Sequence, residues 1–573
     1  MVEGAPDTPR GTVAFGVALA ALAGTLPLAG MRPAELALLV ALGGFVALRI
    51  RSRRDARPLD LPAWVDPVVV TILTLGFLVA GAGLANPDQP VGTDWFDYLG
   101  NAAAVGDGAW DRYHDWRGPL HAWACLALLP LSGGLIAASQ HVALLTATAL
   151  LPLTWWLGRL LLGRWPALLA VGLLAGWADL RLFAVYSTPY ALLAATGTLG
   201  LALTVASRAR PVLAVPAGIA LGAAIATDQR GLVFVAAVAV AAGLDALRPL
   251  PSAAPRPLDA LGSPAPLRRR LAPVFVATAL AFAIGGGALA ALPVTLRPLS
   301  EQVALQRELH AREGAEQCAG EPSLAQVFGP CGRATLSNNL GASGDVFPVE
   351  LATLVVLLVV GLAASPGARA WLLLPILPTL PSLVLVGAQH RYFVPLAPLF
   401  ALLAGAGLAW AASAAGRAPR GTVGRGPGLL ALVVVVGLGV AWHTAPGTLW
   451  TRAHTGKGID PGSLLEGPSV YGRVRAALAP RLGPRDTVVD CARAGMGLRV
   501  YPHRVEDAPP VAGELSRDCA VLVRTGSRAR GVKWVIAVVG PYEVLAPSWE
   551  VVWRGEESPG REAVLLRSTG AGR

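Results

Sequence analysis

Acidic, aromatic and basic side chains are concentrated in one short stretch between two apolar runs. The stretch reads Gly92-Thr-Asp-Trp-Phe-Asp-Tyr-Leu-Gly-Asn101, and Trp116-Arg-Gly-Pro-Leu120 follows it closely. A carboxylate there can take a proton from a hydroxyl group, and a guanidinium group can bind an anion through paired hydrogen bonds. Because aromatic residues flank the acids, Asp94 and Asp97 are both candidate bases. Arg117 is either an anion ligand or an arginine that snorkels to the membrane surface.

Two further turns carry basic residues beside apolar runs. One is Thr227-Asp-Gln-Arg-Gly231, and the other is His390-Arg391-Tyr-Phe-Val-Pro-Leu-Ala-Pro398. Guanidinium suits anion binding in a low-dielectric setting because it stays charged and offers forked donors. Each arginine also has a plainer interpretation. Arg230 can simply pair with Asp228, and Arg391 can anchor a helix at the membrane edge.

The elements that must position these residues are membrane-spanning helices. Of 573 residues, 54% are hydrophobic and only 14% are charged, whereas a soluble domain of this size needs far more polar surface. Apolar runs of about 20 residues recur, each long enough to cross a hydrocarbon core of about 30 Å. The net charge of +11 comes from arginines in short loops between the runs. That is the positive-inside pattern of a polytopic α-helical membrane protein, and we do not expect nucleic acid as a partner.

The basic loops predict which way each segment faces. Arg49–Arg57 should stay cytoplasmic, so the loop that carries Asp94 faces outward. Keeping the other basic loops inside gives about thirteen crossings, with the amino terminus inside and the carboxyl terminus outside. The condition is that Pro119–Ala138, which contains Pro130 and Gly133-Gly134, is interfacial or re-entrant. If that segment spans instead, several arginine loops face outward. The basic markers assigned to the inside are Arg159, Arg164, Arg208, Arg210, Arg248–Arg270, Arg369 and Arg417–Arg425.

Polar residues from distant parts of the sequence fall at the outer face in this topology. The crossings after the re-entrant segment are expected at 142–157, 166–184, 189–206, 211–227, 231–247, 272–294, 349–364, 370–387, 393–412 and 429–442. The polar residues that then face outward are Asp94, Asp97, Asp179, Arg181, Asp228, Arg230, His390 and Arg391. Convergence on one membrane face is what a membrane-embedded active site requires.

Two further outer segments are expected beyond the loop at 86–118. Residues 296–348 are too many for a plain connector and are a candidate lid over the transmembrane domain, which we expect at 1–444. From 445 to 573 short apolar runs alternate with a helical pattern, which predicts a small extracytoplasmic α/β domain. Four cysteines fall in these segments as local pairs, Cys318 with Cys331 and Cys491 with Cys519. An oxidising compartment would allow both pairs to form disulfides, and four unpaired thiols are the alternative.

The order of these residues resembles the first outer loop of the GT-C glycosyltransferases that use polyprenyl-phosphate sugars. These include protein O-mannosyltransferases and the aminoarabinose transferases of lipid A. In that class the loop reads roughly Asp-Glu-x-x-Tyr, then Lys-Pro-Pro-Leu or His-Pro-Pro-Leu. Asp94 and Tyr98 keep the offset of four, although Trp95 replaces the Glu. Arg117-Gly-Pro-Leu120 stands in for Lys-Pro-Pro-Leu, with Gly118 in place of the first proline.

Two later motifs are similar to the same class. His390-Arg391-Tyr392 and the prolines after them resemble the Arg-Tyr-x-x-Pro-x-x-Pro start of a late helix, where the arginine approaches the lipid phosphate. Arg230 lies where the class often has Thr-Lys-Gly. In some relatives an acid follows the turn at which this chain has Ser187-Thr-Pro189, and this departure leaves one position on the acceptor side empty.

The resemblance implies an integral-membrane hexosyl- or pentosyltransferase. It would move a sugar, with inversion, from a polyprenyl-phosphate donor to a protein, lipid or glycan outside the cytoplasm. The expected location is the inner (plasma) membrane, and no nucleotide sugar is expected as donor because the site faces outward. Asp94, which matches the leading acid of the motif, would be the base, with Asp97 as the alternative if the loop is shifted. The residues expected to bind substrate are Tyr98, Arg117, Asp228, Arg230, His390, Arg391 and Tyr392.

Other interpretations of the same residues stay open. A transporter or flippase of a lipid-linked sugar would use a similar polar face, but it should also have ionisable residues deep within spans. An inactive relative that keeps the fold is a third possibility. His114 and His121 could hold a divalent metal together with Asp94, although interfacial histidines are more often structural. No other cofactor is expected.

Overall fold

The structure is a computed structural model of the whole chain. It describes residues 64–82, 85, 93–110, 113, 115, 117–177, 180, 183–185, 188–247, 267–296, 298, 301, 357–377, 394–417, 473–474, 477–481, 488–490, 523–524, 533–539, 544–558 and 561–569. The candidate residues His390, Arg391, Tyr392 and His114 lie outside these ranges, as do Asp179, Arg181 and the four outer cysteines. So do residues 302–356, which include most of the candidate lid.

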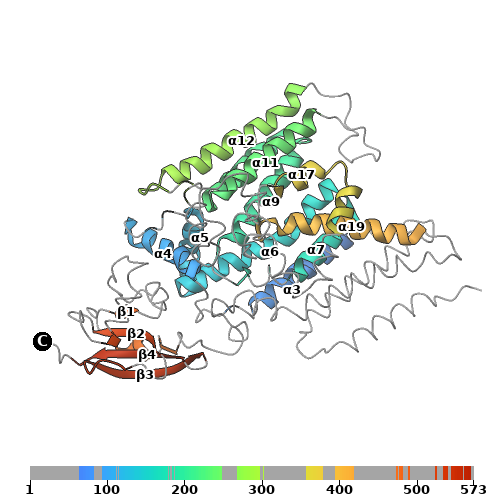
Figure 1. Cartoon of the computed structure of the whole chain (residues 1–573). Helices are drawn as coiled ribbons and strands as arrows, with labels where there is room; N and C mark the ends of the chain where they lie inside the picture. Colours follow the sequence, from blue (N-terminus) through green and yellow to red (C-terminus); the bar gives the residue numbers. More distant parts are fainter. Residues whose placement is uncertain are drawn as a thin grey trace, which may run out of the picture.

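Helices make up the described part of the chain as far as residue 417 (Figure 1). They are α3 (Val65–Ala82), α4 (Thr93–Asp107), α5 (Leu120–Ser132), α6 (Leu135–Leu161), α7 (Arg164–Gly176), α9 (Tyr190–Ser207), α10 (Ala214–Thr227), α11 (Arg230–Leu247), α12 (Leu267–Ala290), α17 (Arg369–Leu373) and α19 (Ala397–Arg417), with the 3₁₀ turn η2 (Pro211–Leu213) before α10. Residues 357–364 are also helical.

The outer loop expected at 86–118 contains a helix. Tyr98, Leu99 and Ala102 are buried on one side of α4, while Gly106 and Asp107 are exposed, so the helix packs one face against its neighbours. Asp94 and Asp97 both fall in the first two turns of this helix, and their side chains lie outside the described part of the structure.

The segment expected to be interfacial or re-entrant is broken where its glycines occur. The helix α5 ends at Ser132, and Gly133 follows with a φ of 71°, a left-handed conformation that residues with a side chain rarely adopt. After Gly134 the chain turns directly into α6, which packs against α5. The break therefore produces two packed helices, of which α5 is short and α6 is long.

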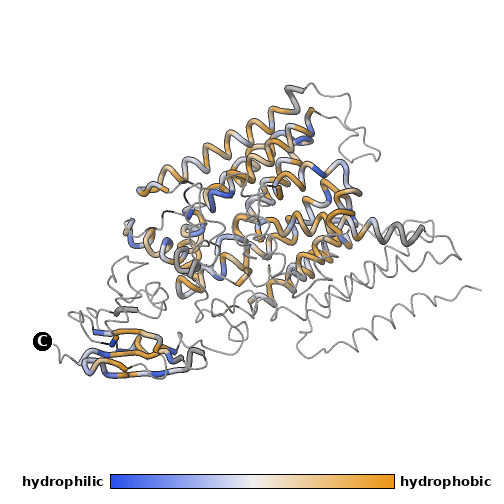
Figure 2. The backbone as a smooth tube through the Cα atoms, in the orientation of Figure 1, coloured by the Kyte–Doolittle hydropathy of each residue, from blue (hydrophilic) through white to orange (hydrophobic). Residues whose placement is uncertain are grey.

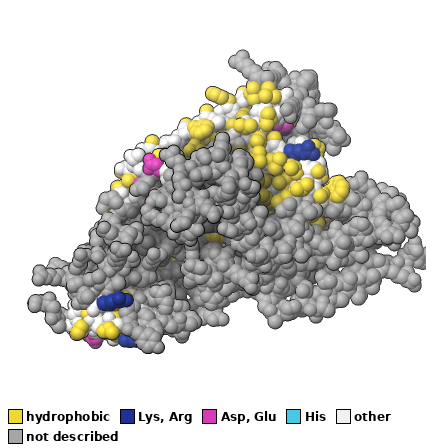
Figure 3. Space-filling model, in the orientation of Figure 1, with side chains coloured by type: hydrophobic (Ala, Val, Ile, Leu, Met, Phe, Trp, Pro, Cys, Tyr) yellow, Lys and Arg dark blue, Asp and Glu magenta, His cyan; other side chains and the backbone are white. Residues whose placement is uncertain are grey.

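The helices α6 and α9 form the centre of the bundle. The helix α6 packs against α3, α5, α7 and α9, while α9 and α12 flank α10 and α19 lies along α7. Of the 18 most apolar consecutive residues in each helix, 89% are buried in α9 and only 28% in α12. The helix α9 is therefore central and α12 peripheral. Phe275, Phe282 and Ile284 of α12 are exposed, and hydrophobic side chains cover the upper edge of the molecule in Figure 3.

Three of the described helices are long and apolar enough to cross a membrane, judged by length and composition. They are α6, α9 and residues Leu271–Ala290 of α12, and the shorter helices α3, α5, α7, α10 and α19 are apolar as well. Hydrophobic residues run along the helices in Figure 2. The expected helical, membrane-type architecture is thus present, while the count of thirteen crossings stays a prediction.

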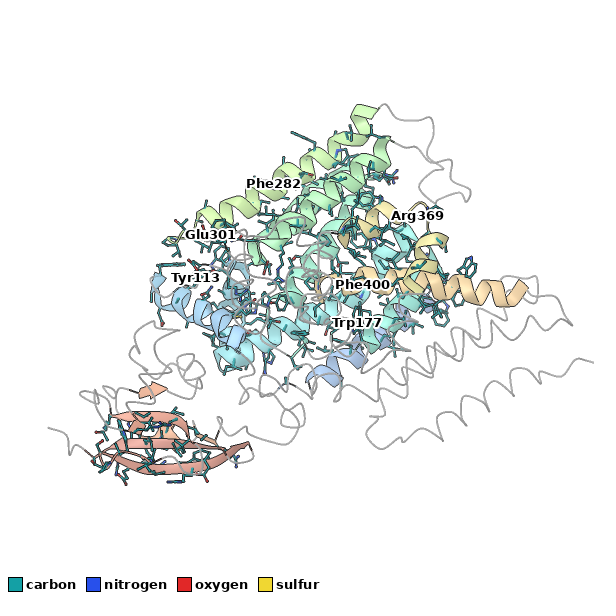
Figure 4. The ribbon with its side chains drawn as sticks, viewed as in Figure 1. Tyr113, Trp177, Phe282, Glu301, Arg369 and Phe400 are labelled. Carbon is teal, nitrogen blue, oxygen red and sulfur yellow. The ribbon has the colours of Figure 1, made fainter. Side chains whose placement is uncertain are left out.

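Arginines assigned to the inside by sequence gather at one end of the bundle. Arg164 donates from Nε to Oδ1 of Asp66 over 2.7 Å, and Arg159 donates to Oδ2 over 3.3 Å. Arg208 pairs with Asp245, which also accepts the indole N–H of Trp371 over 3.1 Å. Arg369 lies at this end too, across the bundle from Tyr113 in Figure 4. Because α7, α9, α10 and α11 alternate in direction, the opposite end holds the starts of α9 and α11 and the carboxyl end of α10.

A small sheet follows the helices in the sequence. Its strands are β1 (Val488–Asp490), β2 (Trp534–Val539), β3 (Trp549–Ser558) and β4 (Arg561–Ser568), in the order β1-β2-β4-β3, and η8 (Ala479–Arg481) precedes them. The pair β1–β2 is parallel and the other pairs are antiparallel. Alternate residues of β2 face opposite sides: Trp534 and Ile536 contact the cluster with Val474 and Leu478. Val535 and its i+2 neighbours contact a second cluster with Val523 and Trp549. A small sheet is therefore present in the carboxyl-terminal part, while an α/β domain that begins at 445 remains an expectation.

Candidate functional site

Tyr98 lies at the centre of a polar cluster at the end of the bundle opposite Arg159 and Arg164. It belongs to α4 and is 2% exposed. Its hydroxyl lies 3.5 Å from the hydroxyl of Tyr190, the first residue of α9, and the two rings meet edge to face. The ring of His121 from α5 also meets that of Tyr98 edge to face, with 5.7 Å between the centroids. Two consecutive helices, α4 and α5, and the distant helix α9 thus meet at one phenol.

The loop between α4 and α5 brings Arg117 over the ring of Tyr98. The guanidinium carbon lies 4.6 Å from the ring centroid, within the range of a cation–π contact. Tyr113 fixes the backbone of this loop, because its hydroxyl donates to the carbonyl oxygen of Arg117 over 2.9 Å. Tyr113 also contacts Asn101, which lies one helical turn after Tyr98 on α4. The loop is therefore attached to α4 at two points on the same face.

Gly118 allows this loop to touch the end of α10. A Cβ atom at this position would lie 2.3 Å from the carbonyl oxygen of Ala226 and 2.8 Å from the carbonyl carbon of Thr227. The Cβ atom would meet backbone atoms, which cannot rotate away, so any larger residue requires the loop or the helix to move. Gly118 occupies the place of the first proline in the resembled motif, and this close contact is a physical reason for the departure.

The turn between α10 and α11 supplies a second arginine. Asp228 has an extended backbone, and its Oδ1 accepts the backbone N–H of Arg230 over 2.9 Å, so it caps the start of α11. The side chain of Arg230 donates from Nε and Nη2 to both carboxylate oxygens, over 2.8 and 2.7 Å. Its guanidinium carbon also lies 5.0 Å from the ring centroid of Tyr190. The plainer interpretation of Asp228, as a partner of Arg230, thus holds, and the pair also orients that arginine over the aromatic ring.

Charge determines the ionisation of Asp228. Burial alone would raise the pKa of its carboxyl group, but the guanidinium of Arg230 and its hydrogen bonds, with a smaller effect of Arg117, leave the pKa below its usual value. Asp228 is therefore ionised at neutral pH. Burial raises the pKa of the Tyr113 hydroxyl, with the hydrogen bond to Asn101 acting in the opposite direction, so Tyr113 stays protonated and remains a donor.

His121, whose ring lies beside that of Tyr98, contacts other side chains of α5 and α6. It is 2% exposed, its Nε2 lies 3.3 Å from Oγ of Ser139, and Cys125 approaches it to 3.8 Å. Among the described residues no three His, Cys, Asp or Glu side chains are arranged to hold a metal. A metal ligand set that includes Asp94 and His114 falls outside those residues.

The structure brings together four residues chosen from the sequence: Tyr98, Arg117, Asp228 and Arg230. Sequence reasoning missed Tyr190, which follows Ser187-Thr-Pro189, the turn that lacks the acid of the resembled class. It also missed Phe183, whose ring meets that of Tyr190 edge to face at 6.1 Å. One feature of the sequence could have indicated Tyr190: the chain has only 8 tyrosines, and Tyr190 begins an apolar run at the predicted outer face.

Solved structures of similar shape place this arrangement in a known fold. The structure of ArnT from Cupriavidus metallidurans bound to undecaprenyl phosphate superposes with a TM-score of 0.53 at 16% identity, over 88% of this chain and 98% of that chain. Its apo state gives 0.53 at 16% identity, over 87% and 97%. ArnT is the lipid A aminoarabinose transferase, a GT-C protein. The chain has the GT-C fold.

The remaining comparisons add little to this result. The oligosaccharyltransferase AglB from Archaeoglobus fulgidus, in complex with an inhibitory peptide and a dolichol-phosphate, reaches a TM-score of 0.46 at 12% identity, over 83% of this chain and 70% of that chain, which is too distant to argue from. No protein-family model and no curated sequence matches the chain. The resemblance drawn from the outer-loop motifs is confirmed at the level of the GT-C fold, and at this identity the likeness establishes fold rather than activity.

Proposed function

We propose that the protein is an integral-membrane glycosyltransferase that transfers a sugar from a polyprenyl phosphate to an acceptor outside the cytoplasm. The observation that carries this proposal is the meeting of Arg117 and Arg230 at the touching phenols of Tyr98 and Tyr190. Two oriented guanidinium groups at one end of an apolar bundle suit the phosphate of a lipid carrier. The structure of ArnT with bound undecaprenyl phosphate, which shares the fold, supports the same donor class.

The reaction needs a base opposite the leaving phosphate. In a single displacement the acceptor hydroxyl oxygen attacks the anomeric carbon and gives its proton to a carboxylate. The bond between that carbon and the phosphate oxygen breaks, and the electron pair leaves with the polyprenyl phosphate. Configuration at the anomeric carbon inverts because only one displacement occurs. Arg117 and Arg230 stabilise the charge that grows on the phosphate.

Asp94 is the proposed base. It precedes Tyr98 by one helical turn on α4, so both positions lie on the same face of the helix. Asp97 is the alternative in the following turn. His390, Arg391 and Tyr392 are proposed to complete the phosphate site, because α19 begins just after them and its Phe400 packs against Trp177 at the carboxyl end of α7 (Figure 4).

The position of charges in the helices favours a transferase over a transporter. The described helices α9 and α10 contain no charged residue. In α7 and α11 the charged residues lie at or near the ends of the helices. A transporter that couples to ions needs ionisable groups near the middle of its spans. We therefore place the outer-end cluster in a catalytic role, at the extracytoplasmic face of the inner membrane, with the carboxyl-terminal α/β unit on the same side.

Substitution of the proposed base tests this function. Purified protein is incubated with a radiolabelled polyprenyl-phosphate sugar and a membrane extract that contains acceptors. Asp94→Asn should lower the rate of transfer at least 100-fold, the range of general-base contributions, while donor binding changes little. Asp107→Asn, an exposed acid at the end of the same helix, is the matched control and should transfer normally.

The outcomes separate the competing functions. If wild-type protein binds the donor but transfers nothing to any fraction, it is a transporter or an inactive relative. If Asp94→Asn retains full transfer and Asp97→Asn does not, Asp97 is the base. Mass spectrometry of envelope glycolipids and glycoproteins from a deletion strain, compared with its parent, would identify the missing sugar and its acceptor together.

A further inference from the structure

The two tyrosines at the centre of the cluster form a matched pair. Their hydroxyl oxygens lie 3.5 Å apart, their rings are inclined by 80°, and each ring face carries a guanidinium group, Arg117 over Tyr98 and Arg230 over Tyr190. Both phenols are almost completely buried, at 2% and 1% exposure. Two separate segments, the α4–α5 loop and the α10–α11 turn, thus converge on one pair of hydroxyls.

This environment makes the hydroxyls stronger hydrogen-bond donors. A cation over a phenol ring withdraws electron density from it, and the hydrogen of the hydroxyl becomes more positive. Tyr98 donates toward Tyr190, and a hydroxyl that accepts one hydrogen bond donates its own hydrogen more strongly. Packing alone does not explain why Tyr190 carries a hydroxyl group, because a phenylalanine at this position would make the same ring contact with Phe183.

A second observation points to a polar ligand at the same place. Thr188, two residues before Tyr190, is 1% exposed, and within the described part of the chain its hydroxyl makes no hydrogen bond. A buried hydroxyl without a partner is unfavourable and uncommon. It lies in the turn that leads into α9, directly before the proposed ligand-binding phenol.

We propose that Tyr190 is a substrate-binding residue whose hydroxyl donates a hydrogen bond to a phosphate oxygen of the lipid carrier, while the hydroxyl of Tyr98 donates to Tyr190 and strengthens that bond. This inference rests on the proposed function and names the groups that recognise the phosphate between the two arginines. The phenols neutralise no charge; they fix the orientation of the phosphate, while the guanidinium groups balance its charge. These groups bind the same phosphate before transfer, when it carries the sugar, and after transfer, in the polyprenyl phosphate that leaves.

Removal of single hydroxyl groups tests the proposal. Binding of undecaprenyl phosphate to the full-length protein in detergent is measured for wild type, Tyr190→Phe, Tyr98→Phe and the double variant. Tyr190→Phe should weaken binding about tenfold, since a hydrogen bond to a charged group is lost while the ring and its cation–π contact remain. Tyr98→Phe should weaken binding less, because it removes only the hydrogen bond that Tyr190 accepts. The double variant should lose less than the product of the two single effects, because the hydroxyls act as a pair.

Two controls separate recognition of phosphate from effects on folding. Thr204→Val removes a buried hydroxyl from the same helix, α9, away from the cluster, and should bind normally. Undecaprenol, which has the same tail and no phosphate, should bind wild type and Tyr190→Phe equally. Phosphatidic acid and inorganic phosphate are used as competitors. Weaker competition by both against Tyr190→Phe than against wild type would locate the effect at the phosphate rather than at the lipid chain.

The experiment also distinguishes this inference from the function on which it rests. If wild type binds undecaprenyl phosphate and Tyr190→Phe binds it equally well, Tyr190 is a packing residue and the inference is wrong. If wild type binds no polyprenyl phosphate at all, the proposed function fails first. If Tyr190→Phe loses phosphate and undecaprenol binding alike, its role is structural, and the inference is again overturned.

Discussion

At the scale of single residues, the site depends on arginines that aromatic rings and a carboxylate hold in place. Arg230 combines two hydrogen bonds to Asp228 with a contact on the face of Tyr190. A flat, forked guanidinium can do both at once, whereas the ammonium group of lysine is a compact point charge. Charge alone is therefore not sufficient at this position, and geometry should matter as much.

We accordingly predict that Arg230→Lys weakens donor binding at least tenfold, although the charge is kept. The Lys side chain cannot donate two parallel hydrogen bonds and cover the ring of Tyr190 together. KM for the polyprenyl-phosphate sugar is the quantity to measure. Arg369→Lys is the control at the other end of the bundle, where Arg369 donates to the carbonyl oxygens of Leu362 and Ala363. An unchanged KM in Arg230→Lys would mean that this arginine contributes only its charge.

The ionisation of Asp228 predicts a pH dependence of stability. Its pKa in the folded protein lies below the ordinary value of 3.8, so the stabilisation it provides is fully present above that value and is lost as the pH falls through the lower, folded pKa. Thermal unfolding in detergent should therefore show no change in the contribution of Asp228 between neutral pH and about pH 5. Below that, wild type should lose stability relative to Asp228→Asn. Parallel curves for the two proteins down to the acid limit would contradict the ion pair.

At the scale of elements, the α4–α5 loop must lie flat against α10 for Arg117 to reach Tyr98. Gly118 makes this possible, because its α-carbon approaches the backbone of Ala226 and Thr227. The contact of Gly118 holds the loop against α10, while the hydrogen bonds of Tyr113 hold it against Asn101 of α4. The position of one guanidinium group thus depends on three elements.

Gly118→Ala should therefore impair the site without touching any polar group. Its Cβ would collide with backbone atoms, so the loop must shift, and we expect donor binding to weaken at least tenfold while the protein still folds. Gly100→Ala on α4 is the matched control: a Cβ there meets nothing within 4 Å, and alanine stabilises a helix by up to about 1 kcal/mol relative to glycine. Equal donor affinity in both variants would show that the loop tolerates the shift.

The sequence predicts some of these elements better than others. Arginines beside apolar runs indicated which residues would share an end of the bundle, and Arg117 and Arg230 do meet there. The helix α4 was expected only as a loop, because Gly100 and the polar residues around it mask an apolar face that depends on tertiary packing. Tyr190 was not foreseen, since a lone tyrosine at a helix start carries no periodic signal. Its partner Tyr98 lies 92 positions away in the chain.

At the scale of the whole molecule, the bundle has two polar ends of different character. One end holds Tyr98, Tyr190, Arg117 and the Asp228–Arg230 pair, and the other holds arginines paired with Asp66 and Asp245. Hydropathy and charge alone predicted the second group as cytoplasmic, because the positive-inside rule acts on each loop separately. The count of crossings could not be fixed in the same way, because broken helices such as α5 depend on how their neighbours pack.

The proposed function depends on the orientation of these two ends in the membrane, and labelling of single cysteines measures that orientation directly. In intact cells that express a variant whose native cysteines are replaced, Asp107→Cys at the end of α4 should react with a membrane-impermeant maleimide. Arg210→Cys, which is exposed between α9 and α10 at the other end, should react only after the cells are permeabilised. The opposite result, with Asp107→Cys protected and Arg210→Cys labelled, would place the arginine–tyrosine cluster in the cytoplasm and contradict the proposed function.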